Sequence, residues 1–350
     1  MAKVSPENIT NVALAGHADS GKTLLADAIL LHAGIIKSLG SIEAGTTQSD
    51  TTPEEKEARR SIYNNTFSVE ANGRLLNFID TPGYFDFVAR PIMAFSAVET
   101  AVLVVNGKTG VEVGVRKLWE YADRAGTAKM VVINRLDEED ADFERTVNQL
   151  KAVFGTQVTP VAVPNGKGAQ FTGVVDILAA DVPADFRNLR ETLVENIVSA
   201  DDALLEKYLE TGEVEPAALE TALHKAVASG ALVPVVPASA LKGVGIAEML
   251  ELMRRCLPSA AAPCRKVLSG ETAETVAVDD KLRACVFKVS VNEFVGRISS
   301  FRIYSSTIRA GDTVYLSGGG SERIPKLYRM QGDKPVSYTH LRAHETVLDL

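Results

Sequence analysis

The chain has 350 residues, of which 46% are hydrophobic and 23% are charged. This composition excludes global disorder, and the length exceeds the roughly 250–300 residues that one hydrophobic core usually serves, so we expect two or three domains. The 37 basic and 45 acidic side chains give a net charge of −8. That sign argues against a general nucleic-acid binder and against sequence-specific DNA recognition, because such proteins need basic surfaces.

Hydropathy and cysteine spacing limit the cellular location. The longest apolar stretches, such as residues 101–106, are far shorter than the ~20 residues that cross a bilayer. The first 20 residues also lack the apolar segment of a secretion signal. Cys256, Cys264 and Cys285 have no C-x-x-C spacing, which favours reduced thiols over a disulfide framework or a zinc site. We therefore expect a cytoplasmic protein that does not engage a membrane.

The first 250 residues alternate short β-rich runs with helical patterns, the first helix covering residues 24–32. This alternation predicts an α/β fold with a mostly parallel sheet and helices on both faces. The predicted strands are residues 11–15, 75–79, 101–106, 130–133 and 233–237.

A long excursion, from about residue 155 to residue 230, separates the fourth and fifth predicted strands. Ordinary connections have a median of ~4–6 residues, so we interpret this region as an inserted α+β subdomain within a domain spanning residues 1–258. Its predicted elements are strands at 158–163 and 171–177, a long helix at 187–208 and a second helix at 216–228.

The pattern changes after residue 258. Residues 259–281 are interpreted as a linker, and residues 282–335 show alternating strands separated by glycine-containing turns. Such a pattern predicts a partial antiparallel β-barrel. Its strands are predicted at 284–291, 296–304 and 313–316.

A glycine-rich segment, G-x-x-x-x-G-K-T, directly follows the first predicted strand and opens the first helix. In this arrangement backbone N–H groups face phosphate oxygens, Lys22 reaches the terminal phosphates and the Thr23 hydroxyl binds Mg²⁺. The strand–loop–helix context favours nucleotide binding over a glycine turn with an idle lysine. The candidate phosphate-binding residues are Gly16, His17, Ala18, Asp19, Ser20, Gly21, Lys22 and Thr23.

A second motif, D-T-P-G, ends the next predicted strand. Its carboxylate can hold a Mg²⁺ ion through water, and the Gly83 amide can meet a γ-phosphate. Alone, this tetrapeptide would be a plain turn. The candidate residues here are Asp80, Thr81, Pro82, Gly83 and Tyr84.

Two further motifs, N-R-L-D and S-A-L, end the fourth and fifth predicted strands. Asp137 can accept hydrogen bonds from the guanine N1–H and 2-amino group, whereas adenine offers neither donor, so we predict GTP rather than ATP. Arg135 can stack on the purine or ribose, or it is a solvated surface charge. The candidate base-binding residues are Asn134, Arg135, Leu136, Asp137, Ser239, Ala240 and Leu241.

The order of these four motifs resembles that of the translational GTPases. Four longer stretches narrow the resemblance to the elongation factor G family: PVAVPNG…FTGVVDIL at 160–178, LLEKYLE at 204–210, FVGRISSFRIYSS…AGDTVY from 294, and LYRMQGDK ending at 334. The resemblance covers residues 9–334. It implies a P-loop GTPase domain with its inserted subdomain, followed by the start of translation-factor domain II.

The resemblance also implies a function. It indicates a monomer that binds GTP or GDP with Mg²⁺, joins the ribosome at the large-subunit factor-binding site and stalk, hydrolyses GTP and leaves. Ribosome translocation and ribosome disassembly both fit. Alternatives are a GTP-dependent ribosome-binding or protection module with weak hydrolysis, and a GTPase-type peptide-chain release factor. The inserted subdomain favours elongation factor G over the release factor.

Tyr84 departs from the family, which usually has histidine after D-T-P-G. A phenol with a pKa of ~10 cannot supply an imidazolium near neutral pH, so we hypothesise a divergent branch in which hydrolysis is slower or differently triggered. The alternative is that Tyr84 packs beside Phe85 and Phe87. The candidate catalytic residues are Lys22, Ser61, Gly83 and Tyr84.

Switch I, the loop that senses the γ-phosphate in this family, also departs from its pattern R-G-I-T. Ser61 falls at the Mg²⁺-binding threonine, while Arg59 and Arg60 replace the glycine and isoleucine. The predicted metal ligands are therefore Thr23, Ser61 and Asp80. Alternatively, residues 54–60 are a charged helix that faces solvent.

The last fifteen residues, 336–350, follow no strand alternation and do not resemble the family. We interpret this tail as foreign to a chain that is the front part of a longer protein. His340 and His344 have the i, i+4 spacing of helical metal ligands, but no third ligand is near, which argues against a metal site.

Overall fold

The computed structural model describes most of the chain. Its described residues are 5–179, 181–261, 266–269, 272–275, 281–292, 296–331, 334–338, 340–342 and 346–349, and side chains are described within 5–179, 181–261, 281–291 and 296–328.

A seven-stranded sheet forms the core of the larger domain, with strand order β2-β3-β1-β4-β5-β9-β6. Neighbouring strands are parallel, except that β2 runs antiparallel to β3. The strands are β1 (Ile9–Ala15), β2 (Asn65–Ala71), β3 (Arg74–Asp80), β4 (Thr100–Asn106), β5 (Ala128–Asn134), β6 (Val158–Pro160) and β9 (Val233–Pro237).

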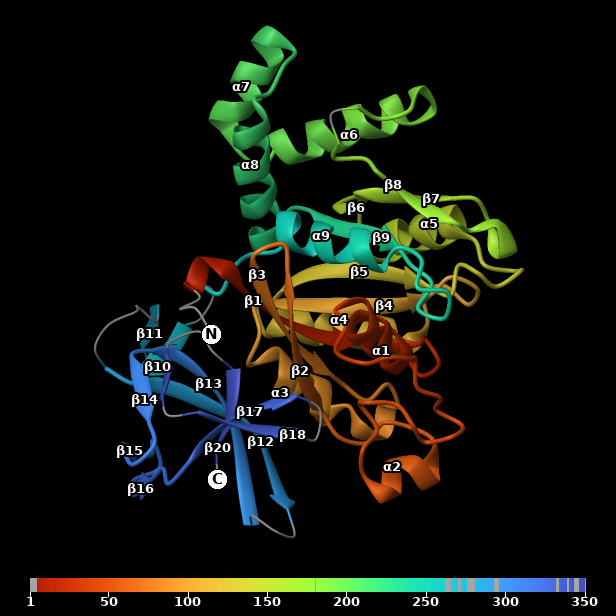
Figure 1. The fold of residues 1–350 in the computed structure, drawn as a ribbon. Helices are drawn as coiled ribbons and strands as arrows, with labels where there is room; N and C mark the ends of the chain where they lie inside the picture. Colours follow the sequence, from red (N-terminus) through yellow and green to blue (C-terminus); the bar gives the residue numbers. More distant parts are fainter. Residues whose placement is uncertain are drawn as a thin grey trace.

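Helices cover both faces of this sheet (Figure 1). Helix α1 lies beside α9 and α3 lies beside α4, on opposite faces. Every residue of β1, β4, β5 and β9 is buried as a result, which explains why their sequences are continuous apolar runs. The helices of this domain are α1 (Lys22–His32), α2 (Pro53–Ala58), α3 (Ala89–Phe95), α4 (Val113–Arg124), α5 (Phe143–Phe154) and α9 (Ile246–Cys256), with 3₁₀ turns at Pro6–Asn8, Phe85–Phe87, Gly168–Gln170 and Ala184–Phe186.

The five strands predicted for this sheet are confirmed, each extended by at most two residues at either end. The predicted parallel sheet lacked β2, the antiparallel edge strand. In β2 only Phe67 and Val69 are buried, alternating with the more exposed Ser68 and Glu70. This strand has one buried face, so its sequence has no continuous apolar run.

The inserted region differs from its predicted elements in two respects. The run at 158–163 is two strands, because β6 pairs with β9 of the main sheet while β7 (Ala162–Asn165) pairs with β8 (Gly173–Asp176). The long helix predicted at 187–208 is also wrong. Asp201 starts a new helix by accepting a hydrogen bond from Leu204 N at 3.3 Å.

Three helices of this region extend away from the main sheet, on the side opposite the C-terminal strands (Figure 1). They are α6 (Arg187–Val198), α7 (Asp202–Thr211) and α8 (Pro216–Ser229). Helices α6 and α7 replace the single helix predicted at 187–208, and α8 confirms the helix predicted at 216–228. Among the described helices of the chain, none is long and apolar enough to span a membrane.

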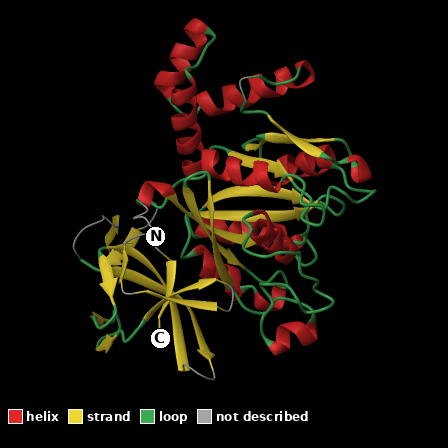
Figure 2. Cartoon of the chain, in the orientation of Figure 1, coloured by secondary structure: helices red, strands yellow, loops and turns green. Residues whose placement is uncertain are grey.

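The C-terminal part consists of strands and loops in the described residues, as Figure 2 shows. A five-stranded antiparallel sheet has the order β12-β13-β20-β17-β18. Three separate two-stranded sheets are formed by β10–β11, β14–β19 and β15–β16. The strands are β10 (Lys266–Ser269), β11 (Thr272–Thr275), β12 (Arg283–Asn292), β13 (Gly296–Ser305), β14 (Thr307–Arg309), β15 (Thr313–Tyr315), β16 (Ser321–Arg323), β17 (Leu327–Gln331), β18 (Lys334–Tyr338), β19 (His340–Arg342) and β20 (Thr346–Asp349).

This arrangement confirms the antiparallel prediction and corrects two details. The predicted linker, 259–281, contains β10 and β11. The tail at 336–350, for which no strand was expected, contributes to β18, β19 and β20. Short strands can pair through backbone hydrogen bonds without alternating side chains, so the pattern missed them. Cys264 and His344 lie outside the described residues, as does the side chain of His340.

A buried polar network joins the C-terminal strands to the main sheet. The Arg302 guanidinium on β13 donates to Glu99 Oε1 at 2.8 Å, and both side chains are at most 1% exposed. Glu99 Oε2 accepts from Asn11 Nδ2 at 2.7 Å, Asn77 donates to Asn11, and Ser68 donates to Asn77. The network crosses β4, β1, β3 and β2, so the position of the C-terminal strands is coupled to the register of this sheet.

Replacing Arg302 by methionine should therefore destabilise the protein strongly. The substitution leaves a buried carboxylate without its guanidinium, a loss that typically costs about 3–5 kcal/mol. Urea or thermal unfolding measures the effect. Arg297→Met is the matched control, because its ion pair with Glu322 is more than half exposed, and such pairs contribute at most about 1 kcal/mol. Equal losses in the two variants would contradict this account.

Candidate functional site

The glycine-rich loop lies between β1 and α1 and is tightly packed. A Cβ atom on Gly16 would lie 2.3 Å from the carbonyl oxygen of Val104, and one on Gly21 would lie 2.5 Å from Asn134 Nδ2. Gly21 also has a φ of +85° at the N-cap of α1. Side chains cannot be accommodated at these two positions without displacing backbone or Asn134, so the motif requires glycine there.

Lys22 lies at the centre of this loop. Its ammonium donates to the carbonyl oxygens of Gly16 and His17, each at 2.9 Å. Burial lowers the pKa of Lys22 to about 8, although the negative charge of Asp80 opposes the shift. A desolvated cation held by backbone carbonyls is suited to binding a polyanion, because phosphate oxygens would compensate its burial.

The D-T-P-G segment lies directly against the loop. Thr81 anchors it, since its backbone N–H and its hydroxyl both donate to Leu14 O, at 3.1 and 2.8 Å. A Cβ atom on Gly83 would lie 2.4 Å from Lys22 Nζ and 2.9 Å from His17 O. The first two predicted motifs are thus brought into contact, with the Lys22 ammonium beside Gly83.

The three predicted metal ligands are oxygen donors near the start of α1. Thr23 Oγ1 lies 3.1 Å from Ser61 Oγ. Both carboxylate oxygens of Asp80 are buried without a hydrogen-bond partner, and burial raises the pKa of Asp80 to about 7. A hard cation that prefers oxygen ligands would compensate this charge, so the residues present fit Mg²⁺.

Three more residues with buried, unpartnered oxygen atoms were missed by the sequence reasoning. They are Thr47, Ser49 and Asp50. Burial raises the pKa of Asp50, and the negative charge of Asp50 also contributes to the raised pKa of Asp80. The only sequence signal was a short polar run, T-T-Q-S-D. Asp27 of α1 holds this run in place by accepting hydrogen bonds from Gly40 N and Gln48 N, each at 3.1 Å.

The described residues contain no cluster of three or more histidine, cysteine, aspartate or glutamate side chains that could hold a metal ion. An ion at this site would therefore be held by hydroxyl groups, one or two carboxylates and the phosphates of a nucleotide. That mixed set is typical of Mg²⁺ sites in nucleotide-binding proteins.

Asn134 joins the base-binding motifs to the phosphate loop. Its Nδ2 donates to Ser20 O at 3.0 Å, and its Oδ1 accepts from Ala240 N at 3.0 Å. Ser239 Oγ donates to Asp137 Oδ1 at 2.6 Å, which orients that carboxylate. The N-R-L-D and S-A-L motifs therefore meet beside the phosphate loop, as their order along the sheet predicts.

Arg135 and Leu241 are the outer residues of these motifs. Arg135 has a positive φ of 62°, and its guanidinium donates to Glu138 Oε1 at 2.9 Å. The two side chains of this pair are 39% and 32% exposed, and stacking of Arg135 on a purine stays a prediction. Leu241 is 64% exposed, so it contributes little to the packing of the motif.

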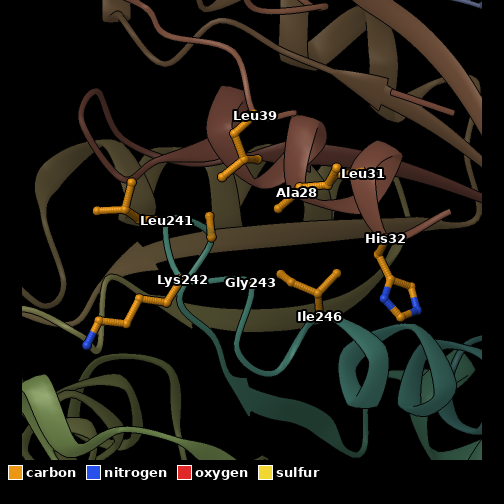
Figure 3. A pocket seen from close by; sticks show the side chains of 9 residues that line it. Ala28, Leu31, His32, Leu39, Leu241, Lys242, Gly243 and Ile246 are labelled. Atoms are coloured by element: carbon orange, nitrogen blue, oxygen red, sulfur yellow. The ribbon is translucent and has the colours of Figure 1, made fainter. Parts of the chain in front are cut away.

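A cavity of about 290 Å³ lies between α1 and the loop after β9. Figure 3 shows Ala28 and Leu31 of α1 and Leu39 around the same space as Leu241 and Ile246, while Lys242 extends away from it. Lys242 Nζ donates to Ala169 O at 3.2 Å. The lining is mainly apolar, which makes this cavity unsuited to binding phosphate or a metal ion.

Tyr84 follows the D-T-P-G segment and is 36% exposed. The Arg60 guanidinium lies 5.0 Å from the centre of its ring, within the range of a cation–π contact. Tyr84 and Phe85 also line a cavity of about 120 Å³ together with His17 and Pro82. The ring of Tyr84 is thus held between an arginine of the switch I segment and an apolar cavity.

The segment before Ser61 contains helix α2 and one buried carboxylate. Residues 54 and 56–60 are exposed, as the alternative prediction of a charged helix facing solvent expects, whereas Glu55 of α2 is 1% exposed. Its Oε2 accepts hydrogen bonds from Thr52, and its Oε1 accepts from Ile62 N and Tyr63 N, each at 3.0 Å. Glu55 therefore ties together the two ends of residues 52–63, between which Arg60 and Ser61 lie.

Comparison with known proteins agrees with this geometry. The model of the elongation factor Tu GTP-binding domain matches residues 7–259. The chain belongs to the translational GTPases. An elongation factor G-like protein from Thermotoga maritima is 33% identical over 325 aligned positions, covering 88% of this chain and 47% of that protein. Elongation factor G from Granulibacter bethesdensis is 29% identical over 365 aligned positions, covering 95% and 52% respectively.

A solved structure supports the same assignment. The crystal structure of ttk003000868 from Thermus thermophilus superposes with a TM-score of 0.86 at 32% identity, covering 98% of this chain and 52% of that one. The chain is thus a divergent elongation factor G-like member of the family and a guanine-nucleotide-binding protein. It spans about half the length of the curated relatives it matches.

Replacing Asp80 by asparagine should have opposite effects on stability and on binding. Without a ligand, the free energy of unfolding should rise by about 1–3 kcal/mol at pH 8, because a buried charge with no hydrogen-bond partner is removed. The increase in melting temperature that a GTP analogue with Mg²⁺ produces should be lost. Thermal unfolding with and without both ligands measures the two effects.

The pH dependence has a defined sign. The Asp80 carboxyl has an ordinary pKa of 3.8, and burial in the folded protein raises this pKa to about 7. The stabilisation by Asp80→Asn should therefore grow from about pH 4 to about pH 7. Asp86→Asn, at an exposed carboxylate nearby, is the control. A stabilisation that shrinks as pH rises would show that the burial of Asp80 is not its cause.

Proposed function

We propose that this chain binds GTP with Mg²⁺ and hydrolyses it as part of a factor that acts on the ribosome in the cytoplasm, in translocation or in ribosome disassembly. The observation that carries the proposal is the hydrogen bonding of Asn134 to both Ser20 O and Ala240 N. It links the phosphate loop to the guanine-recognition motifs, so a single nucleotide can contact all of them.

Guanine selection is assigned to Asp137. Ser239 occupies one oxygen of its carboxylate, and the remaining acceptor capacity can receive the N1–H and 2-amino donors of guanine. Adenine lacks both donors and would leave the carboxylate unpaired, which accounts for discrimination against ATP. Arg135, paired with Glu138, would border the base from the outside.

Phosphate binding and hydrolysis are assigned to residues that converge on Lys22. Its ammonium would bind the terminal phosphates, and the Gly83 amide would donate to the γ-phosphate. Thr23, Ser61 and Asp80 would hold Mg²⁺, which neutralises charge on the phosphates when it is bound. Water attacks the γ-phosphorus, the bond to the bridging oxygen of GDP breaks, and GDP and phosphate leave.

Tyr84 favours a second candidate function. A GTP-dependent ribosome-binding module with weak hydrolysis would need the same site, but it would not need a group that polarises water. Tyr84 lacks the imidazolium that the family usually places there, and its ring is engaged by Arg60. A peptide-chain release factor is less well supported, because two relatives that match along most of this chain are elongation factor G and an elongation factor G-like protein.

Ser61→Ala tests the switch I assignment. We expect the Mg²⁺ concentration that half-saturates binding of a non-hydrolysable GTP analogue to rise about tenfold or more, in the range seen when support of a metal is lost. GDP affinity should be unchanged, because only the γ-phosphate state engages this loop. Ser61→Thr, which keeps the hydroxyl, is the control. Equal weakening of both nucleotides would refute the assignment.

Tyr84→Phe tests how hydrolysis depends on the phenol. Ribosome-stimulated turnover in the full-length protein should change by less than about twofold, because phenylalanine keeps the ring that Arg60 contacts. GTP turnover with and without ribosomes measures this and separates an efficient GTPase from a weakly hydrolysing binding module. Lys22→Met provides the inactive reference. A hundredfold drop in Tyr84→Phe would show that the hydroxyl takes part in hydrolysis.

A further inference from the structure

The C-terminal strands contact the nucleotide-binding domain at a second point, next to Ser61. Lys288 on β12 donates from Nζ to the backbone oxygen of Asn64 at 2.5 Å. Asn64 is 2% exposed, and its Nδ2 donates to Arg90 O of α3 at 2.9 Å. One asparagine therefore joins β12, the end of the switch I segment and the helix that follows Tyr84.

The next residue extends this connection to the polar run beside Asp80. Asn65 Nδ2 donates to Ser49 O at 2.6 Å and to Gln48 O at 3.2 Å. Ser49 and its neighbour Asp50 carry buried oxygens without partners next to the predicted metal ligands. The dipeptide Asn64-Asn65 thus holds both segments of chain that supply oxygens to that region.

Ser61 is only three residues from Asn64, and the residues between them are fixed. Glu55 accepts hydrogen bonds from Ile62 N and Tyr63 N, and the Arg90 guanidinium lies 5.0 Å from the centre of the Tyr63 ring. A displacement of Asn64 would therefore move Ser61 relative to Thr23, because the intervening backbone has little freedom to absorb it.

Lys288 is suited to hold Asn64. Burial lowers its pKa to about 8, with Glu55 favouring and Arg90 disfavouring its charge, so it is mostly protonated at neutral pH. An ammonium removed from water forms a strong hydrogen bond to a backbone carbonyl. The loss of its donor would leave the buried carbonyl of Asn64 unsatisfied in that direction.

From these contacts we propose that Lys288 is a positioning residue for the metal site: by fixing Asn64, the C-terminal strands hold Ser61 beside Thr23. This inference rests on the proposed function of the site as a Mg²⁺–GTP site. It gives the C-terminal strands, which carry none of the predicted nucleotide-binding residues, an effect on how the Ser61 hydroxyl binds the ion. A partner that shifted β12 would thereby alter nucleotide binding.

Lys288→Met tests this, because methionine keeps much of the length and apolar stem but cannot donate. We expect the Mg²⁺ concentration that half-saturates binding of a fluorescent non-hydrolysable GTP analogue to rise at least about threefold, within the range reported for residues coupled through contact networks. Mg²⁺-dependent GDP binding should change less than twofold. The ratio of the two effects is the readout, because a general loss of stability would affect both.

Tyr304→Phe is the matched control. The Tyr304 hydroxyl also donates from the C-terminal strands to a backbone oxygen of the larger domain, Ser96 O at 2.5 Å, but Ser96 follows α3 and is not part of the switch I segment. The Tyr304→Phe substitution should lower the melting temperature without changing the ratio of the Mg²⁺ effects on analogue and GDP binding. If Lys288→Met does not fold, Lys288→Leu, which also cannot donate to Asn64 O, provides the same comparison.

The outcomes are distinct. The role of Lys288 would be overturned if wild type binds the analogue but Lys288→Met, or its substitute, leaves the ratio of the Mg²⁺ effects on analogue and GDP binding unchanged. An equal change of this ratio in Tyr304→Phe would overturn it as well. A wild-type protein that shows no Mg²⁺-dependent binding of the GTP analogue would instead overturn the proposed function on which the inference depends.

Discussion

The side-chain amide of Asn134 fixes the geometry on which the candidate site depends. It is completely buried, and it both donates to the phosphate loop and accepts from the S-A-L loop. A carboxylate could not donate and a hydroxyl could not span both contacts, so an amide at the end of β5 is required. Gly21 must lack a side chain because Asn134 Nδ2 occupies the space where its Cβ would lie.

Charge burial is the second constraint. Lys22 and Asp80 are both buried, and burial shifts the pKa of each toward its neutral form. A stable core would avoid such groups, whereas a site for a polyanion and a cation gains from them, because the ligands compensate the desolvated charges when they bind. The unpartnered oxygens of Thr47, Ser49 and Asp50 extend the same arrangement beyond the recognised motifs.

The departures from the family pattern act together. Arg60, predicted to stand where the family has isoleucine, contacts the ring of Tyr84, predicted to stand where the family has histidine. Glu55 fixes the backbone on both sides of Arg60 and Ser61, and the C-terminal strands reach this segment through Lys288. The switch I segment and the segment after D-T-P-G are thus connected by the cation–π contact between Arg60 and Tyr84.

The sequence by itself determined the motifs, their order and the five strands that carry them, because a parallel sheet buried on both faces needs continuous apolar runs and a phosphate loop needs glycines at fixed positions. It therefore predicted the family and the guanine nucleotide. It could not reveal β2, the break at Asp201 or the pairing of Thr346–Asp349, because half-exposed and short elements depend on partners distant in the chain. Only the tertiary structure brought Asp50, Glu55 and Lys288 to the site, since their roles come from burial and from hydrogen bonds to backbone atoms, which leave no pattern in the sequence.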